Sequence, residues 1–314
     1  MADLIELYEH PEAKEIFMIA GWRQWADAGS VSSGLPKYLV QRGRARQIGR
    51  IRPEGFYMFQ IPGTHDLIRP VVKFNEGYPE MLDAPENNFF YFEKGDHGVV
   101  VFLGEEPHMD IERYVGAVLD AARQLRVKRI VGLGGVYGEF PYEKERAISG
   151  NYSLHSLREE VNDLALNLSD YHGGASIGSY MCKRAGERGM EYVGMYAMVP
   201  IYDFSNVAQI GHSIQIENDY MAWLGIMRRI NFMFKIKFNL THLAQKSQRL
   251  IDNVASKVDQ IVEKAPQAGV REYFQRLSEE FEETPFIPLD DVWEQNLRRI
   301  FDKLDDDEDE EEDK

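Results

Sequence analysis

Cysteine is almost missing from this 314-residue sequence, which contains only Cys182. A single cysteine provides neither a disulfide framework nor a cysteine-based metal site. Long apolar runs are missing too, since none approaches the roughly 20 residues of a membrane-spanning helix. The first residues, MADLIELYEHPEAKE, carry charges where a signal peptide needs an apolar segment. We therefore expect a cytoplasmic protein that makes no contact with a membrane.

Positive charge is in short supply, because 36 lysines and arginines face 52 aspartates and glutamates, for a net charge of -16. Nucleic-acid phosphates and anionic lipids repel such a chain, so neither is an expected partner. Nine of the carboxylates lie in residues 305–314, DDDEDEEEDK. A block of like charges repels itself and buries nothing, which predicts a disordered acidic tail. The tail either keeps the protein soluble or docks on a basic partner surface.

Motifs for metals and cofactors are also absent. The eight histidines show no H-E-x-x-H pattern, no paired spacing and no cysteine partners. The glycines of GLGGVYG (132–138) follow an apolar run, but the third comes one position late for the dinucleotide-binding pattern G-x-G-x-x-G. We therefore expect no metal and no cofactor.

Short apolar runs alternate with helical patterns in residues 1–235. Such alternation predicts a three-layer α/β/α domain around a mostly parallel, mixed central sheet. GDHG, at 95–98, marks a tight turn between two antiparallel strands. The expected strands are 15–20, 46–51, 70–74, 88–93, 98–103, 128–134 and 191–198, and the expected helices are 30–42, 109–126, 153–167, 176–188 and 206–229.

Residues 236–304 form a separate helical extension in this interpretation. Apolar residues recur at spacings of three and four from Phe238 until Pro266 stops the pattern. Two further helices are expected, around 273–281 and 291–304. Their apolar faces must cover either the main domain or a neighbouring subunit. We expect packing between subunits through the stripe Leu250, Ile251, Val254, Val258 and Ile261.

The stretch AGWRQWADAGSVSSGL (20–35) leaves the first strong strand and enters the first helix. Open α/β sheets bind ligands at this position, and the small residues Ala28, Gly29 and Ser30 allow a ligand to approach the backbone closely. Asp27 would cap the helix. The side chains of Trp22, Arg23 and Trp25 either fold inward or form a contact surface for a ligand or another protein.

Five short motifs resemble, in order and spacing, the proteasome assembly chaperone 2 family of bacteria and archaea. They are GWRQWADAG (21–29), LGEEP (103–107), FPYEKERAISG (140–150), HGGASIG (172–178) and MYAMVPIY (195–202). The resemblance covers residues 1–230, and the helical extension is similar to that of the longer bacterial members. It implies a fold akin to the nucleoside phosphorylase and peptidyl hydrolase scaffold, a homo-oligomer with a trimer favoured, and no established catalytic activity.

The resemblance also implies which residues line a cleft at the strand ends, in a structural or ligand-binding role: Asp27, Gly29, Glu106 and Ser176, with Ser30 beside them. Two departures stand out. Some members dock their carboxyl terminus in the proteasome ring, whereas this chain ends in EEEDK. Many members have a histidine in the loop where this chain has Pro141, Tyr142, Glu143 and Lys144.

The pattern G-x-S-x-G around Ser176 is also the nucleophile elbow of serine hydrolases. Asp203 with His212 or His242 would complete a triad in the correct order. The preceding LNLSDYHG, however, is polar and turn-like where the elbow needs a strand. Small residues that open a helix explain the motif without chemistry. Adjacent Glu105 and Glu106 could share a proton, but we expect one of them to cap the next helix instead.

Two functions remain open from the sequence. The first is a non-catalytic, homo-oligomeric protein-interaction or assembly-chaperone-like protein that binds itself and a further protein. The second is a small-metabolite-binding protein or a hydrolase- or phosphorylase-like enzyme that uses the cleft at the carboxyl ends of the strands. A cleft filled by the chain's own side chains would favour the first.

Overall fold

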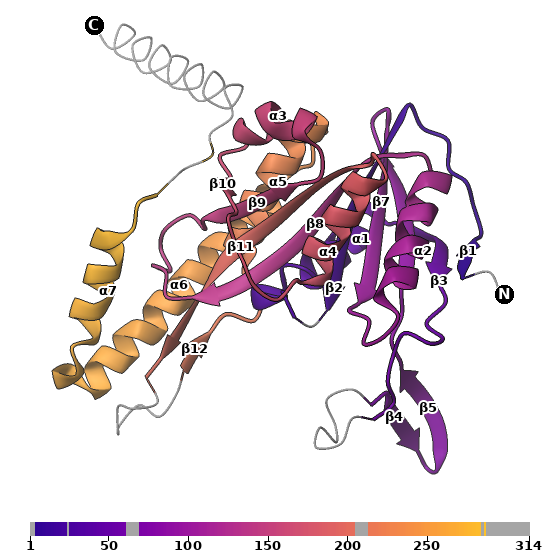
Figure 1. Cartoon of the computed structure of the whole chain (residues 1–314). Coiled ribbons are helices and arrows are strands. Elements are labelled where there is room, and N and C mark those ends of the chain that lie inside the picture. Colours follow the sequence, from indigo (N-terminus) through magenta and orange to yellow (C-terminus); the bar gives the residue numbers. More distant parts are fainter. Residues whose placement is uncertain (1–3, 24, 61–68, 205–212, 284–285, 287–314) are drawn as a thin grey trace, which may run out of the picture.

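The computed structural model describes residues 4–23, 25–60, 69–204, 213–283 and 286. A twisted sheet runs through the centre of the molecule, with helices on both faces (Figure 1). Its strands lie in the order β1 (Ile5–Leu7), β3 (Arg46–Ile51), β6 (Asn88–Lys94), β7 (His97–Glu105), β2 (Glu15–Arg23), β8 (Val127–Gly138), β11 (Glu191–Asp203), β9 (Ile148–Tyr152) and β10 (Asn167–Leu168).

The four central strands β7, β2, β8 and β11 are parallel, and antiparallel pairs flank them on both sides. The centre of β2, IFMIAGW, is buried without interruption, as expected for a strand covered on both faces. β6 and β7 join through the two residues Gly95 and Asp96, which confirms the turn predicted at GDHG. The predicted α/β/α class with a mixed, mostly parallel sheet is confirmed.

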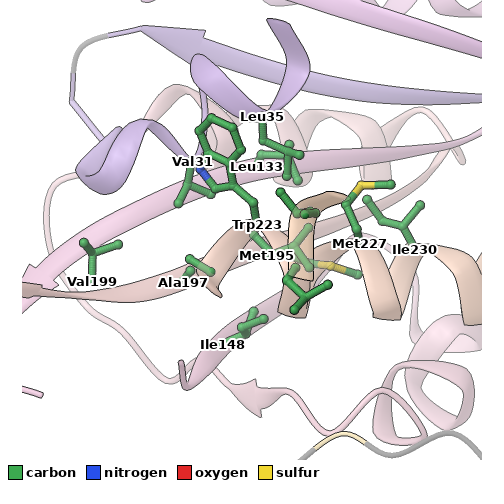
Figure 2. Close-up of a cluster of buried hydrophobic side chains, with 14 of the residues drawn as sticks. Val31, Leu35, Leu133, Ile148, Met195, Ala197, Val199, Trp223, Met227 and Ile230 are labelled. Atoms are coloured by element: carbon green, nitrogen blue, oxygen red, sulfur yellow. The ribbon is translucent and has the colours of Figure 1, made fainter. Parts of the chain in front are cut away.

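Helices α2 (Ile111–Gln124) and α4 (Ile177–Glu187) contribute to one of two hydrophobic cores. Helices α1 (Gly34–Gly43), α5 (Tyr220–Phe234) and α6 (Thr241–Lys264) contribute to the other. Figure 2 shows this second core, where three side chains of α5 meet side chains of the sheet and of the segment that leads into α1. They are Trp223, Met227 and Ile230 of α5, with Val31, Leu35, Leu133, Ile148, Met195, Ala197 and Val199.

The predicted extension begins with α6, which packs on α5 and shares its core. Val254 and Val258 are buried there within their own chain, and Leu250 and Ile261 are partly buried against the same core. This corrects the expectation that the stripe packs between subunits. In α7 (Val270–Glu280), the Phe274 ring lies 4.7 Å from that of Tyr202, edge to face. The helix predicted at 291–304 and the tail at 305–314 lie outside the described residues, so the division into domains stays a prediction.

Several predicted elements differ from the structure near turns. Ala28–Ser30 is a short 3-10 helix, and α1 starts at Gly34, which places Pro36 in the first turn, where a backbone N–H has no helical partner. The helix expected at 153–167 is a 3-10 turn (His155–Leu157), a short α3 (Arg158–Asn162) and strand β10. The first part of the helix expected at 206–229 lies outside the described residues; after it, Ser213–Gln215 form strand β12 beside β11, and α5 starts at Tyr220.

The strand predicted at 70–74 exists as β4 (Val71–Asn75), but it lies outside the central sheet. Among the described residues it pairs only with β5 (Tyr78–Asp83), in a hairpin that projects from the body (Figure 1). Among the described residues, no helix is both long enough and apolar enough to cross a membrane.

Candidate functional site

The motif GWRQWADAG lies at the carboxyl ends of β2, β7 and β8, where ligands bind in many α/β proteins. Trp22 is its most buried aromatic residue, at 3% exposed. The indole N–H donates to the Tyr114 hydroxyl at 3.0 Å, and the ring packs edge to face on Phe102. Because a buried side chain presents no surface, Trp22 is a core residue, and its predicted place in an interaction surface is wrong.

Asp27 binds the backbone just before α1, and it does not cap the helix itself as predicted. Its Oδ1 accepts the backbone N–H groups of Ser32 and Ser33 at 2.9 and 2.8 Å, groups that have no helical partner of their own. Burial raises the pKa of the Asp27 carboxyl, while these hydrogen bonds partly lower it again. Asp27 therefore orders the loop.

Gly29 and Ser30 contact the chain around α5 and not an open cleft. The Gly29 carbonyl accepts the backbone N–H of Asp219 at 2.9 Å and the indole N–H of Trp223 at 3.1 Å. The Ser30 hydroxyl donates to the carbonyl of Glu217 at 2.7 Å. Gly29 has a φ of +59°, and a Cβ there would lie 2.7 Å from the Asp219 Cβ. The small residues thus allow close packing of the protein's own backbone.

The sequence analysis missed an ion pair below this loop. Arg146 Nε donates to Asp219 Oδ2 at 2.8 Å, and the two side chains are 2% and 0% exposed. Arg146 Nη1 also donates to three carbonyls of the loop between Pro141 and Lys144, and the other oxygen of Asp219 accepts two N–H groups at the start of α5. The pair ties the motif FPYEKERAISG to α5, which gives both segments a structural role.

Glu105 and Glu106 point to different partners. Glu105 Oε2 accepts from Arg23 Nε at 2.9 Å. Glu106 accepts the backbone N–H of Ile177, the first residue of α4, at 3.1 Å and that of Trp25 at 3.2 Å. One glutamate does cap a helix, but the helix is α4 and not α2, the next one in the chain. Burial raises the pKa of both carboxyls, and the hydrogen bonds that each accepts partly offset this.

Ser176 opens α4, as predicted. Its hydroxyl oxygen accepts the backbone N–H of Ser179 at 3.2 Å and lies 3.3 Å from the Tyr196 hydroxyl. No described histidine contacts Ser176, since His242 hydrogen-bonds through Nδ1 to Tyr38 on α1 and His212 lies outside the described residues. These contacts are those of a helix cap, and they do not form a nucleophile elbow.

The space at the strand ends is almost filled. In the part of the chain that the structure describes, the cavity between Trp22, Glu106, Ser176 and Tyr196 has a volume of about 10 Å³. A single water molecule needs about 10–15 Å³ of such volume, so no metabolite fits. Asp27, Gly29 and Ser30 do not line this cavity. Only Glu106 and Ser176, of the five residues predicted to line a cleft, therefore meet at it.

The single cysteine is not activated either. Cys182 is buried, and burial raises its pKa to about 12, so it is a neutral thiol at physiological pH. Within the described part of the chain, no three histidine, cysteine, aspartate or glutamate side chains gather in a group that could hold a metal ion.

Above the filled cavity, Trp25 is 76% exposed. Its backbone is fixed by Glu106, and the neighbouring Ala26 carbonyl accepts the N–H of Gly135 on β8. Val136, the next residue along β8, is also exposed. Arg23 is half exposed and held by Glu105. The carboxyl ends of the strands therefore present a surface with an exposed tryptophan and arginine, which we call the carboxyl edge.

Both the sequence and the fold of this chain are similar to those of known proteins. A sequence model of the PAC2 family matches residues 22–258, and no curated protein matches the chain. Structural neighbours include a PAC2 family protein from Streptomyces avermitilis, with 21% identity, a TM-score of 0.66, and coverage of 82% of this chain and 99% of that one. A proteasome-assembly chaperone homologue from Mycobacterium tuberculosis has 20% identity, a TM-score of 0.66 and the same coverage.

A third neighbour is PbaB of Pyrococcus furiosus, an archaeal proteasome activator, with 15% identity, a TM-score of 0.58, and coverage of 81% and 98%. At these identities the solved structures show a shared fold. The family match extends over most of the chain and includes four of the five motifs in full and the first from Trp22 onward. The chain belongs to the PAC2 family.

Proposed function

We propose that this chain is a non-catalytic, homo-oligomeric protein with an assembly-chaperone-like role, which binds a further protein at its carboxyl edge. Its family, and the assembly chaperone homologue among its structural neighbours, support a role of this kind. The trimer expected from the sequence is part of the proposal.

One observation carries the proposal: the place where an α/β enzyme would bind its substrate is filled by the chain's own side chains. The remaining cavity of about 10 Å³ admits no metabolite, and the hydroxyl of Ser176 serves as a helix cap. Glu106 and Asp27 use their carboxyl oxygens on backbone N–H groups. Ser176, Glu106 and Asp27 therefore each have a structural partner.

The same edge presents the features of a protein contact. Tryptophan and arginine are enriched among the residues that dominate binding energy in protein interfaces. Trp25 is exposed while its backbone N–H is held by Glu106, and the Arg23 guanidinium is held by Glu105, so part of the ordering cost of binding is met before a partner arrives. This pre-organisation supports a binding role for the surface.

The test is a photo-crosslinking amino acid placed at position 25 in the host cell. The control is the same amino acid at Tyr8, an aromatic residue that is also exposed but follows the edge strand β1, which three strands separate from β2. The proposal expects a discrete protein adduct from position 25 and none from position 8. The same adduct from both positions, or none from either, would contradict it.

A further inference from the structure

Two stretches of this acidic sequence contain no aspartate or glutamate. They are residues 28–53 and 220–251, and each holds six lysines and arginines. The first stretch contains α1, and the second contains α5 and the start of α6. Twelve of the 36 lysines and arginines therefore lie in segments that offer them no carboxylate nearby in the sequence.

The fold brings the two stretches together. The Tyr38 hydroxyl of α1 lies 3.0 Å from Nδ1 of His242 on α6, and the two rings stack with their centroids 5.9 Å apart. Burial and the positive charges of Arg42, Lys246 and Arg249 lower the pKa of His242, and no acidic group is among these causes. Cations from α1 and α6 therefore gather around one histidine. We call Arg42, His242, Lys246 and Arg249 the basic face.

The charges of the basic face have no acidic partner in the described parts of the chain. Arg42 and Arg249 are exposed and form no ion pair with any described residue. Lys246 Nζ donates to the Tyr220 hydroxyl at 3.4 Å and lies 4.5 Å from the centre of its ring, so its partner is neutral. α6 also begins without an acidic residue in its first turn, and the positive end of its dipole adds to the field. The basic face therefore attracts anionic groups.

The tail at residues 305–314 carries the matching charge. Its nine carboxylates and one lysine account for half of the net charge of -16. The carboxylates follow one another directly in the sequence, so several of them reach the separate cations of the basic face at once. Because the tail is tethered to the surface that attracts it, its effective concentration there is on the order of millimolar. A nucleic acid lacks this advantage and is repelled by the rest of the chain.

The chain is long enough for the tail to reach the basic face of its own molecule. The last described residue is Phe286, whose ring centroid lies 5.7 Å from that of Phe232 on α5, and α6 runs beside α5 (Figure 1). Ten residues separate Phe232 from His242, which is at most about 36 Å of chain. Residues 287–304 span up to about 60 Å when extended, so they bridge this separation with length to spare.

We propose that the basic face is a binding surface for acidic peptide segments and that the acidic tail of the same chain occupies it. The contact goes beyond the function proposed above, because it involves neither the carboxyl edge nor a second subunit. An acidic segment of another protein then binds this face only by displacing the tail.

The test is crosslinking of the full-length protein with a water-soluble carbodiimide, which joins a carboxylate to a lysine amine in contact with it. Lys246 reports on the basic face. Lys257 is the control, because it lies on the same helix about three turns further on and is the more exposed of the two. Mass spectrometry of the digested protein should find the tail linked to Lys246 in preference to Lys257. Equal yields at the two lysines would overturn the proposal.

Charge reversal gives a second measurement. Arg42→Glu combined with Arg249→Glu reverses two exposed charges and keeps Lys246 as the reporter. We expect the link to Lys246 to fall about tenfold, as two exposed contacts turn from attraction to repulsion. Lys257→Glu, outside the basic face, should leave it unchanged. In wild-type protein, 1 M salt should also remove the link, because the Debye length falls to about 3 Å. A link that survives both the reversal and the salt would contradict binding by charge.

Isotope labelling distinguishes the tail of the same chain from that of a neighbour. Chains with light and heavy nitrogen are mixed in urea and refolded together, so that any subunits combine at random. Links between the tail and Lys246 should then carry a single isotope. Links that carry both isotopes would overturn the assignment to the same chain. A monomeric wild type would contradict the homo-oligomer proposed above but leave this contact intact.

Discussion

Replacing Gly29 by alanine tests whether the small residues of the loop serve internal packing. Gly29 has the left-handed φ of +59°, which costs an alanine about 1–2 kcal/mol. The new Cβ would also lie 2.7 Å from the Asp219 Cβ and 3.1 Å from both methyl groups of Val199, and overpacking of this kind costs about 1–3 kcal/mol. We therefore expect Gly29→Ala to lower the free energy of unfolding by about 2–5 kcal/mol.

Gly95→Ala is the matched control. Gly95 has the same φ of +59°, but a Cβ at that position would meet no atom within 4 Å. It should therefore show the backbone cost alone, about 1–2 kcal/mol. Urea unfolding of both variants gives the two free energies. Equal losses for Gly29→Ala and Gly95→Ala would show that Gly29 faces open space, and this would refute our account of the loop as internal packing.

Three further predictions concern the polar contacts at the strand ends. Ser176→Ala should lower the free energy of unfolding by about 1 kcal/mol, as the loss of a helix cap does. Wild-type protein should not react with a fluorophosphonate probe, and stoichiometric labelling would contradict this. Arg146→Met leaves the Asp219 carboxylate buried without its ion pair and should lower the free energy of unfolding, measured in urea, by about 3–5 kcal/mol. A loss below about 1 kcal/mol would contradict a stabilising role for the ion pair. Because burial raises the pKa of Glu106 above its ordinary value of 4.5, the folded state holds this proton more tightly, and stability is lost as pH rises from 4.5 through the folded pKa. The stability of Glu106→Gln relative to wild type should therefore rise over that interval, and a pH-independent difference would contradict the burial effect.

The sequence predicts the central sheet well because its strands are buried on both faces. Continuous apolar runs such as IFMIA in β2 are visible without knowledge of their neighbours. Strand β9, ISGNY, has no such run, and it forms because β11 offers a partner. The hairpin shows the reverse case: an apolar stretch at 70–74 predicts a strand, but nothing in the stretch says that the strand leaves the sheet.

Only part of the site could be predicted from the sequence, because some of its contacts join residues that are far apart in the chain. The capping role of Ser176 depends on residues close by in the sequence and is confirmed, whereas Asp27 binds the backbone N–H groups of the two residues before α1 and does not cap the helix itself. The ion pair of Arg146 and Asp219 joins residues 73 positions apart, which no local pattern reports. A capping aspartate before the apolar run of α5 was a usable signal, but the helix expected from residue 206 concealed it. Trp22 and Trp25 look alike in the sequence, and only the fold decides which is buried.

The mass of the wild-type protein in solution tests the central claim most directly. We propose that this chain acts through contacts between subunits and with another protein, and not through chemistry in a cleft. Light scattering at micromolar concentration should give a multiple of 36.3 kDa, with three subunits as the predicted number. A mass of one subunit that persists over a hundredfold range of concentration would contradict it.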